Sequence, residues 1–198
     1  MSARPLILAS KSSSRRAMLD AAGVFYQAIP ADLDERAIED SLEGASAKDI
    51  ALALAVSKAQ AVAVQHQDAL VLGSDSLIVV EGRRFDKPTS KQNAAEHLRF
   101  FSGKVMELHS AAALVCNNSC EWSAPSLAKL HVRDLGETFI EQYLDQEWPE
   151  VSYCVGVFRI EALGVQLFEQ IEGDQFTVLG MPLLGVLGAL RELGELPV

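Results

Sequence analysis

The chain has 198 residues, of which 49% are hydrophobic and 22% are charged, and its formal net charge is -10 at pH 7. This composition is typical of a globular protein, and no run of about 18 or more apolar residues indicates a membrane span. The negative charge argues against nonspecific nucleic-acid binding, which needs a basic surface. An acidic protein that binds phosphates must gather its cations in one place and recruit a divalent metal ion.

The N-terminal sequence and the cysteines bear on location. "MSARPLILAS" contains an apolar run that is too short for a secretory signal, so we expect a cytoplasmic protein. Cys116, Cys120 and Cys154 are odd in number and form no C-x-x-C pair. This pattern supports neither a disulfide framework nor a structural zinc site, and we expect the cysteines to be reduced.

A short buried strand and a helix are predicted near the N-terminus. The strand is "PLILA", and the helix is "SSSRRAMLDAAG", with serine at its cap and Gly23 just past its end. A helix N-terminus offers free N–H groups and the positive end of the helix dipole, so Ser10, Ser12 and Arg15 could form a phosphate cradle. The alternative is that the serines only cap the helix and Arg15 stays solvated.

A long helix is predicted from Ala47 to Gln65, with Ser46 as its cap, after the acidic loop "ADLDERAIEDSLEGAS". Lys58 shares a face of this helix with apolar residues one and two turns earlier. Its ammonium group must therefore either extend outward to water or reach a partner. In the acidic loop, Asp34 and Glu35 could ligate a metal or orient bound groups, although solvated carboxylates are the usual explanation.

Two apolar strands, Ala69–Leu72 and Leu77–Val80, are predicted on either side of "GSDS". Asp75 in this segment could accept a proton from an attacking water or hold a metal ion. The alternative is an Asx turn between the strands. A carboxylate at the end of a buried strand is costly unless a cation meets it, which favours the functional interpretation.

Lys87 follows in "FDKPTS", where Pro88 favours an extended conformation of the residue before it. That restriction would aim the ammonium group in a fixed direction, although an ordinary loop lysine fits the local sequence equally well. A helix is predicted next, from Lys91 to Phe101, with a capping box of Thr89 and Gln92.

The second half of the chain mixes strands and helices. "LAKLHVR" alternates as a half-buried strand, and Thr138 and Glu141 form the capping box of a further helix. "FRIEALG" places Arg159 and Glu161 on one face of a strand, and "IEGD" is predicted to be a hairpin turn leading to "QFTVL". A final helix ends the chain. We therefore predict a mixed α/β or α+β fold with one central sheet and a single domain over residues 1–198.

The residue types also favour one kind of chemistry. The sequence contains no P-loop and no legible Ser/His/Asp or Cys/His arrangement. Its scattered lysines, arginines and carboxylates are what metal-assisted hydrolysis of a phosphoanhydride requires. Cations spread the developing charge, carboxylates seat the metal, and a base activates water.

Seven motifs occur in order along nearly the full chain. They are "LASKSSSRR", "LDE" at 33–35, "SKAQA" at 57–61, "GSDSL" at 73–77, "DKPTS" at 86–90, "SGKVMELHS" at 102–110 and "GVQLFEQIEGDQFTVLGMPLL". Each motif alone is common, but the ordered series resembles the Maf-like family of nucleoside triphosphate pyrophosphatases.

This resemblance implies a central mixed sheet flanked by helices, with two lobes around a deep substrate cleft. It also implies hydrolysis of a nucleoside triphosphate to the monophosphate and pyrophosphate with Mg²⁺ or Mn²⁺. By position, Asp75 would accept the proton of water, and Lys58 and Lys87 would contact the phosphates. The remaining residues that the resemblance and the helix-end argument implicate are Ser10, Ser12 and Arg15 for the polyphosphate, and Glu35 with Asp75 for the metal.

Some positions depart from the family pattern. Ser13 stands where the family has proline, Ser14 stands where its branches have arginine or tryptophan, and Asp86 replaces the glycine before the lysine. "FRIEALG" carries Glu161 where the pyrimidine-selective branch tends to have "YGIQG", so the chain looks closer to the branch that acts on 7-methyl-GTP. A carboxylate there can accept from the guanine N1–H and exocyclic amine.

Other functions compete with this expectation. One is hydrolysis of dTTP or UTP by an enzyme of the same family. Another is a non-catalytic nucleotide-binding regulator of cell division, which the family's historical link to septum formation suggests. A third is a phosphatase that releases orthophosphate. A homodimer would also be consistent with the resemblance.

Overall fold

The computed structural model describes residues 4–117 and 119–197. The chain forms two compact units. Unit 1 comprises Met1–Ser76, Ser110–Ser126 and Asp174–Val198, and unit 2 comprises Leu77–His109 and Leu127–Gly173. The predicted mixed α/β class is confirmed. The single domain and the cleft stay predictions.

The sheet is mixed, as expected. Within the described residues it has seven strands in the order β2-β1-β3-β5-β6-β7, with β4 paired to β3. β1 runs parallel to both β2 and β3, whereas the β3–β4 and β6–β7 pairs are antiparallel. The strands are β1 (Leu6–Leu8), β2 (Gln27–Ala28), β3 (Leu70–Val80), β4 (Arg83–Phe85), β5 (Val105–Cys116), β6 (Ser119–Val132) and β7 (Phe168–Glu172).

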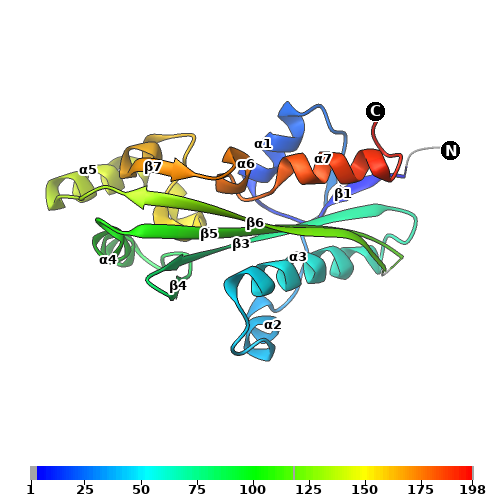
Figure 1. Cartoon of the computed structure of the whole chain (residues 1–198), viewed down its shortest axis with the longest axis horizontal. Helices are drawn as coiled ribbons and strands as arrows, with labels where there is room; N and C mark the ends of the chain where they lie inside the picture. The colour runs from blue at the N-terminus through cyan, green and yellow to red at the C-terminus, as the bar shows by residue number, and fades with distance from the viewer. Residues whose placement is uncertain (1–3, 118, 198) are drawn as a thin grey trace. The chain divides into compact units, whose positions relative to one another are not determined.

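Helices cover both faces of the sheet in unit 1, where α1 and α7 lie on one face and α3 on the other (Figure 1). The helices of unit 1 are α1 (Ser13–Ala21), α2 (Glu35–Ser41), α3 (Ala47–Ala63), α6 (Gln175–Val178) and α7 (Leu183–Glu192). Unit 2 contains α4 (Lys91–Phe101), α5 (Glu137–Glu147) and the short 3-10 helices Glu150–Tyr153, Val155–Val157 and Leu163–Leu167. The predicted helices at α1, α3, α4, α5 and α7 are confirmed.

The core of unit 1 follows the two-residue period of its strands. Leu8 of β1 and Leu72 of β3 belong to an apolar cluster that also includes Met18 of α1 and residues of α7. Their neighbours Ile7 and Val71 belong to a second cluster, which includes alanines of α3. Because side chains alternate between the faces of a strand, each strand contributes to both layers of core. Two-sided burial explains why these strands are continuously apolar in sequence.

The segment "GSDS" does not interrupt a strand. β3 runs unbroken from Leu70 to Val80, so the prediction of two strands and a break is wrong. Glycine and aspartate are poor strand formers, but burial and tertiary contacts decide the conformation here. Gly73 lies so close to α3 that an added Cβ would be 2.1 Å from the Ala55 carbonyl oxygen. The glycine therefore allows a helix and a strand to pack closely, and Asp75 sits inside a strand rather than in an Asx turn.

Some helix starts also differ from the prediction. The supposed acidic loop contains α2, and the Asp34 side chain caps it by accepting from the Ala37 N–H at 3.1 Å. α4 is capped by Ser90 rather than by a box beginning at Thr89. α5 begins after Gly136, with no side-chain cap from Thr138. Cap motifs recur by chance in polar segments, and backbone geometry selects among neighbouring candidates.

The C-terminal motif differs more strongly. "QFTVL" contains α6 instead of a strand, and Asp174 is not part of a simple hairpin turn. Its carboxylate caps α6 by accepting from the Thr177 N–H at 2.9 Å. Arg159 and Glu161 lie between 3-10 helices, so the expected strand face that they share does not exist. A short β-rich sequence can be helical when its cap and packing require it.

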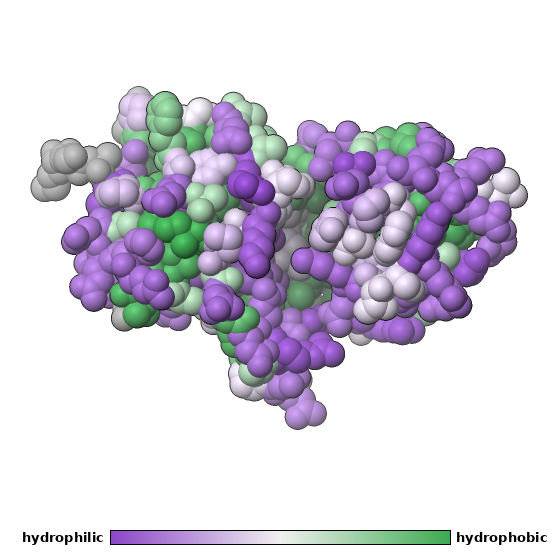
Figure 2. Space-filling model, turned by 180° about the vertical axis from the view of Figure 1, so that it is seen from behind, coloured by the Kyte–Doolittle hydropathy of each residue, from purple (hydrophilic) through white to green (hydrophobic). Residues whose placement is uncertain are grey.

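The surface of α2 is hydrophilic. None of its residues is buried, and hydrophilic residues dominate this projecting region of Figure 2. In residues 4–117 and 119–197, helices fall short of the length and apolarity needed to cross a membrane.

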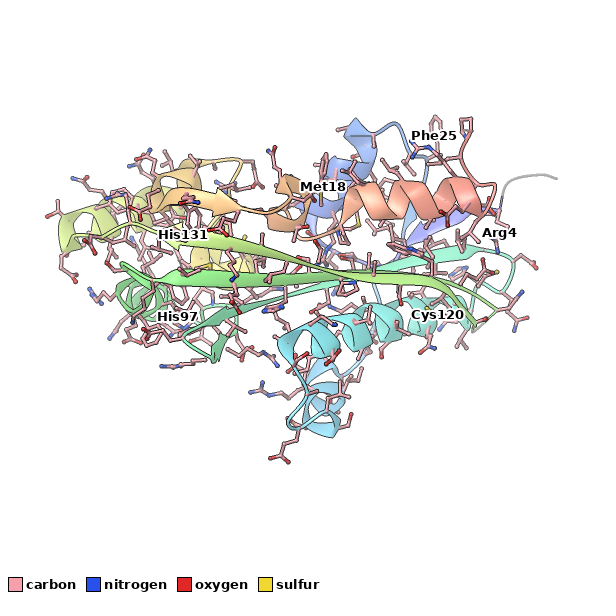
Figure 3. The ribbon with its side chains drawn as sticks, in the orientation of Figure 1. Arg4, Met18, Phe25, His97, Cys120 and His131 are labelled. Atoms are coloured by element: carbon pink, nitrogen blue, oxygen red, sulfur yellow. The ribbon has the colours of Figure 1, made fainter. Side chains whose placement is uncertain are left out.

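His97 of α4 is a polar group within an aromatic cluster of unit 2 (Figure 3). Its ring contacts that of Phe85 edge-on, with the ring centroids 5.2 Å apart. Its buried Nδ1 atom has no hydrogen-bond partner among the described residues. Burial lowers the pKa of His97 below its ordinary value, and the positive charge of Arg83 lowers it further.

This shift predicts a loss of stability in acid. Because the unfolded state binds the proton more readily, the contribution of a neutral His97 is complete above the unfolded pKa of 6.5 and declines as the pH falls below it. Between pH 8 and pH 5.5, the melting temperature of the native protein should therefore fall further than that of His97→Gln. Differential scanning calorimetry would measure both. Parallel declines would show that His97 does not contribute.

Candidate active site

Lys58 lies between two carboxylates in unit 1. From α3 its Nζ atom lies 2.5 Å from Asp75 Oδ1 of β3 and 3.1 Å from Glu35 Oε1 at the start of α2. The side chains of Lys58 and Asp75 are only 12% and 9% exposed, whereas that of Glu35 is 52% exposed. Of the two alternatives for Lys58, the structure supports a partner rather than extension into water. The ion pair with Lys58 therefore offsets the cost of burying the Asp75 carboxylate.

The alternation of β3 places different groups on its two faces. Asp75 and Gly73 share the face that packs against α3. The intervening Ser74 instead donates a hydrogen bond to the Gly180 carbonyl oxygen at 3.1 Å, and the hydroxyl of the following Ser76 lies within hydrogen-bond distance of the same oxygen, also at 3.1 Å. One strand thus supplies a carboxylate to one side and two hydroxyls to the other.

Arg15 of α1 reaches the hydroxyl side of this arrangement. Its Nε atom donates to the Gly180 carbonyl oxygen at 2.9 Å, Nη2 donates to Ser76 Oγ at 3.1 Å, and Nη1 donates to Ser10 Oγ at 3.3 Å. All three acceptors are uncharged. The guanidinium is therefore held in place without a carboxylate bonded to it in the described part of the chain.

The electrostatic surroundings of Arg15 link the two sides. Burial lowers the pKa of Arg15, whereas the charges of Asp75 and Glu35 act in the opposite direction. An arginine side chain remains protonated even so. The site thus contains two cations, Arg15 and Lys58, together with two carboxylates that influence them.

The serines before α1 have distinct roles. Ser12 caps the helix by accepting from the Arg15 N–H at 3.3 Å, and Ser10 Oγ accepts from the Ser12 N–H at 3.2 Å. The capping alternative therefore describes Ser12. It does not describe Arg15, which is bonded rather than solvated, while the exposed Arg16 donates to the Lys11 carbonyl oxygen at 3.3 Å.

Lys87 and Glu161 belong to unit 2. Both are exposed, and the charges of both act on the pKa of the half-buried Cys154. Burial, followed by the negative charge of Glu161, raises the pKa of this thiol to about 11, while Lys87 opposes the rise. Nearby, Arg159 Nε donates to the buried Glu147 Oε2 at 2.9 Å. The fold thus gathers the two predicted residues of unit 2 around one thiol.

Sequence reasoning missed several polar residues of the site. Ser74, Ser110 and Thr177 are fully buried, and Ser76 and Gly180 bond directly to Arg15. The serines flanking Asp75 in "GSDS" were a usable signal, because hydroxyls inside an apolar strand need partners. The signal for Gly180 was absent, since its contact with Arg15 spans 165 positions.

The carboxylates suit a divalent ion that also binds substrate. Within the described ranges, no group of three or more His, Cys, Asp or Glu side chains could form a protein-only metal centre. Magnesium is commonly held by one or two carboxylates together with water and substrate phosphates. Asp75 and Glu35, which both contact Lys58 Nζ, are a donor set of that kind.

Comparison with known proteins gives a consistent result. The family model described as "Maf-like protein" matches residues 5–193. The chain is 47% identical to a 7-methyl-GTP pyrophosphatase of Rhizobium meliloti (strain 1021), over 96% of this chain and 97% of the relative. It is 44% identical to a nucleoside triphosphate pyrophosphatase of Nitrobacter hamburgensis, over 98% and 96% of the two chains respectively.

Proposed function

Because the chain belongs to the Maf-like family, we propose that it hydrolyses a nucleoside triphosphate to the monophosphate and pyrophosphate. The observation that carries this proposal is the contact of Lys58 with Asp75 and Glu35, whose charges also act on the half-buried guanidinium of Arg15. The names of the similar proteins support the same reaction. In a cell it would remove unwanted or modified nucleotides, and we expect it to act in the cytoplasm.

In the proposed reaction, Asp75 accepts a proton from a water molecule as the water oxygen attacks the α-phosphorus. The bond between the α-phosphorus and the oxygen that bridges to the β-phosphorus then breaks, and pyrophosphate leaves with the electron pair. Lys58 and Arg15 balance negative charge on the phosphates, in a site where burial strengthens electrostatic interactions. Ser10 and Ser12 order the start of α1 beside the polyphosphate. Lys87 would contribute a further phosphate contact.

Asp75 and Glu35 would hold Mg²⁺ or Mn²⁺. When bound, the ion supplies positive charge that polarises phosphoryl oxygens. The protein itself is strongly acidic, so concentrating cations at this site lowers the repulsion that a triphosphate would otherwise meet.

For the base, we propose 7-methyl-GTP or a related guanine nucleotide. The exposed Glu161 carboxylate can accept from two neighbouring donors of guanine, a pattern that uracil and thymine lack. The name of the Rhizobium meliloti relative supports this choice. Selectivity for dTTP or UTP is the alternative within the same reaction class. Self-association as a homodimer remains a separate expectation.

A nucleotide panel tests both reaction and substrate. With Mg²⁺ or Mn²⁺, 7-methyl-GTP should yield monophosphate and pyrophosphate faster than UTP or dTTP, and removal of the metal with EDTA should stop turnover. Pyrophosphate and orthophosphate would be measured separately. Release of orthophosphate alone would indicate the phosphatase alternative, and nucleotide binding without turnover would indicate the regulator.

The same panel with Glu161→Gln tests base recognition. Glutamine keeps the size of the side chain but replaces one acceptor oxygen with a donor amide, so the preference for the guanine nucleotide should fall by about tenfold, the effect of losing one hydrogen bond to a charged group. Turnover of UTP should change little. An unchanged preference would show that Glu161 is not the selecting residue.

A further inference from the structure

The carbonyl oxygen of Gly180 is crowded with donors. It lies within hydrogen-bond distance of Arg15 Nε at 2.9 Å and of the hydroxyls of Ser74 and Ser76, each at 3.1 Å. A carbonyl oxygen has two lone pairs, so three donors compete for two good positions. Gly180 has φ +99°, which favours glycine. This backbone conformation therefore presents the oxygen to three side chains at one point.

The hydroxyl of Ser76 has an alternative acceptor that relieves the competition. Ser76 Oγ is 2.9 Å from the fully buried Ser110 Oγ, which in turn donates to the Thr177 carbonyl oxygen at 3.0 Å. If protons are ordered from Arg15 to Ser76, then to Ser110 and to Thr177, each hydroxyl accepts one bond and donates one. Gly180 then receives only Arg15 and Ser74. We name Ser76, Ser110 and the Thr177 carbonyl the hydroxyl relay.

The far end of the hydroxyl relay is firmly fixed. Asp174 Oδ2 accepts from the Thr177 N–H at 2.9 Å and from its hydroxyl at 3.2 Å. Ser126 Oγ also forms a hydrogen bond with Thr177 Oγ1, at 2.7 Å. Thr177 is fully buried, so these bonds have no competition from water. The relay thus connects the cap of α6 to the guanidinium of Arg15.

The relay leaves Arg15 with spare donors in a defined plane. A guanidinium has five N–H donors, and hydrogen bonds to Gly180, Ser10 and Ser76 use three of them. Within the described residues, the groups that accept hydrogen bonds from this guanidinium are all neutral. Because the plane is fixed before binding, less side-chain entropy is lost when a phosphate binds to Arg15.

We propose that Ser76 is a positioning residue, which orients the guanidinium of Arg15 toward the polyphosphate through the hydroxyl relay. The inference rests on the proposed function for the identity of the ligand. It assigns to Ser76 no contact with the reacting atoms. Its role is to keep Arg15 in the orientation that accepts a chain of phosphates.

The test uses inorganic triphosphate as a probe, because it needs neither a base nor hydrolysis. Isothermal titration calorimetry should give about tenfold weaker binding to Ser76→Ala than to the native protein, as expected for one hydrogen bond to a charged group. Ser76→Thr, which keeps the hydroxyl, should restore most of the affinity. Ser41→Ala removes an exposed hydroxyl outside the relay, one that donates to the Ile38 carbonyl oxygen of α2, and it should bind within about twofold of the native protein.

A double-mutant cycle separates positioning from general damage. In the Arg15→Ala background, Ser76→Ala should weaken triphosphate binding no further, because the group that Ser76 orients is gone. An equal loss in both backgrounds, unchanged affinity of Ser76→Ala, or failure of the native protein to bind triphosphate would overturn the proposal. Native turnover of the nucleotide panel is a separate readout. A protein with the expected cycle but no turnover would retain this inference and lose the proposed pyrophosphatase activity.

Discussion

Replacing Asp75 with asparagine should reduce kcat about a thousandfold while nucleotide binding persists. Asparagine preserves the shape of the side chain but removes its capacity to accept the proton of water, and general-base catalysis contributes about 10²–10⁴ in rate. The change also replaces one of the two carboxylates proposed to hold the metal. Turnover of the preferred nucleotide would be measured at saturating Mg²⁺, and binding would be measured by calorimetry with an α,β-methylene analogue.

The chain provides a matched control for this substitution. Asp145 also lies 2.5 Å from a lysine, Lys91, but its side chain is 72% exposed. An exposed ion pair of this kind contributes little to stability. Asp145→Asn should therefore leave kcat and the melting temperature close to their native values. If Asp75→Asn retained more than about a tenth of native kcat, a different group would have to accept the proton, because a general base contributes at least about 10².

The predictions from sequence succeeded where the decisive signal is local. Caps and periodicity identify α3, whose cap Ser46 accepts from the Asp49 N–H at 3.2 Å as predicted. The same reasoning located α1 and the final helix α7. These patterns work because a cap and the N–H that it binds lie within one turn.

The predictions failed where distant segments decide. Gly73 was predicted to interrupt a strand because the local sequence does not reveal its close contact with α3. The position of Lys58 on an apolar face allowed either solvent or a partner, and only the fold places Asp75 and Glu35 beside it. "QFTVL", the segment just before Gly180, was predicted to be a strand, whereas the Gly180 carbonyl oxygen accepts from Arg15 near the other end of the chain.

Gly73 therefore provides the most severe test of how the site is built. In Gly73→Ala, the added Cβ would be 2.1 Å from the Ala55 carbonyl oxygen and 2.7 Å from the Ala59 backbone nitrogen. Both neighbours are backbone atoms of α3, which cannot rotate away as a flexible side chain can. We expect a loss of about 3 kcal/mol in the free energy of unfolding, at the upper end for overpacking. Urea titration followed by far-ultraviolet circular dichroism would measure it.

Gly188→Ala is the control that isolates crowding from the loss of glycine. Gly188 lies within α7, and an added Cβ would have nothing within 4 Å. Alanine is favoured over glycine by about 1 kcal/mol in a helix interior, so Gly188→Ala should be more stable than the native protein. Equal urea midpoints for the two variants would refute the close-packing explanation of Gly73. If the close-packing explanation holds, displacement of α3 in Gly73→Ala should also move Lys58 away from Asp75. In buffer without urea, the folded Gly73→Ala protein should therefore turn over nucleotide more slowly than Gly188→Ala. The same absent methyl group that permits the helix to approach the strand would then be a condition for pairing the lysine with the carboxylate.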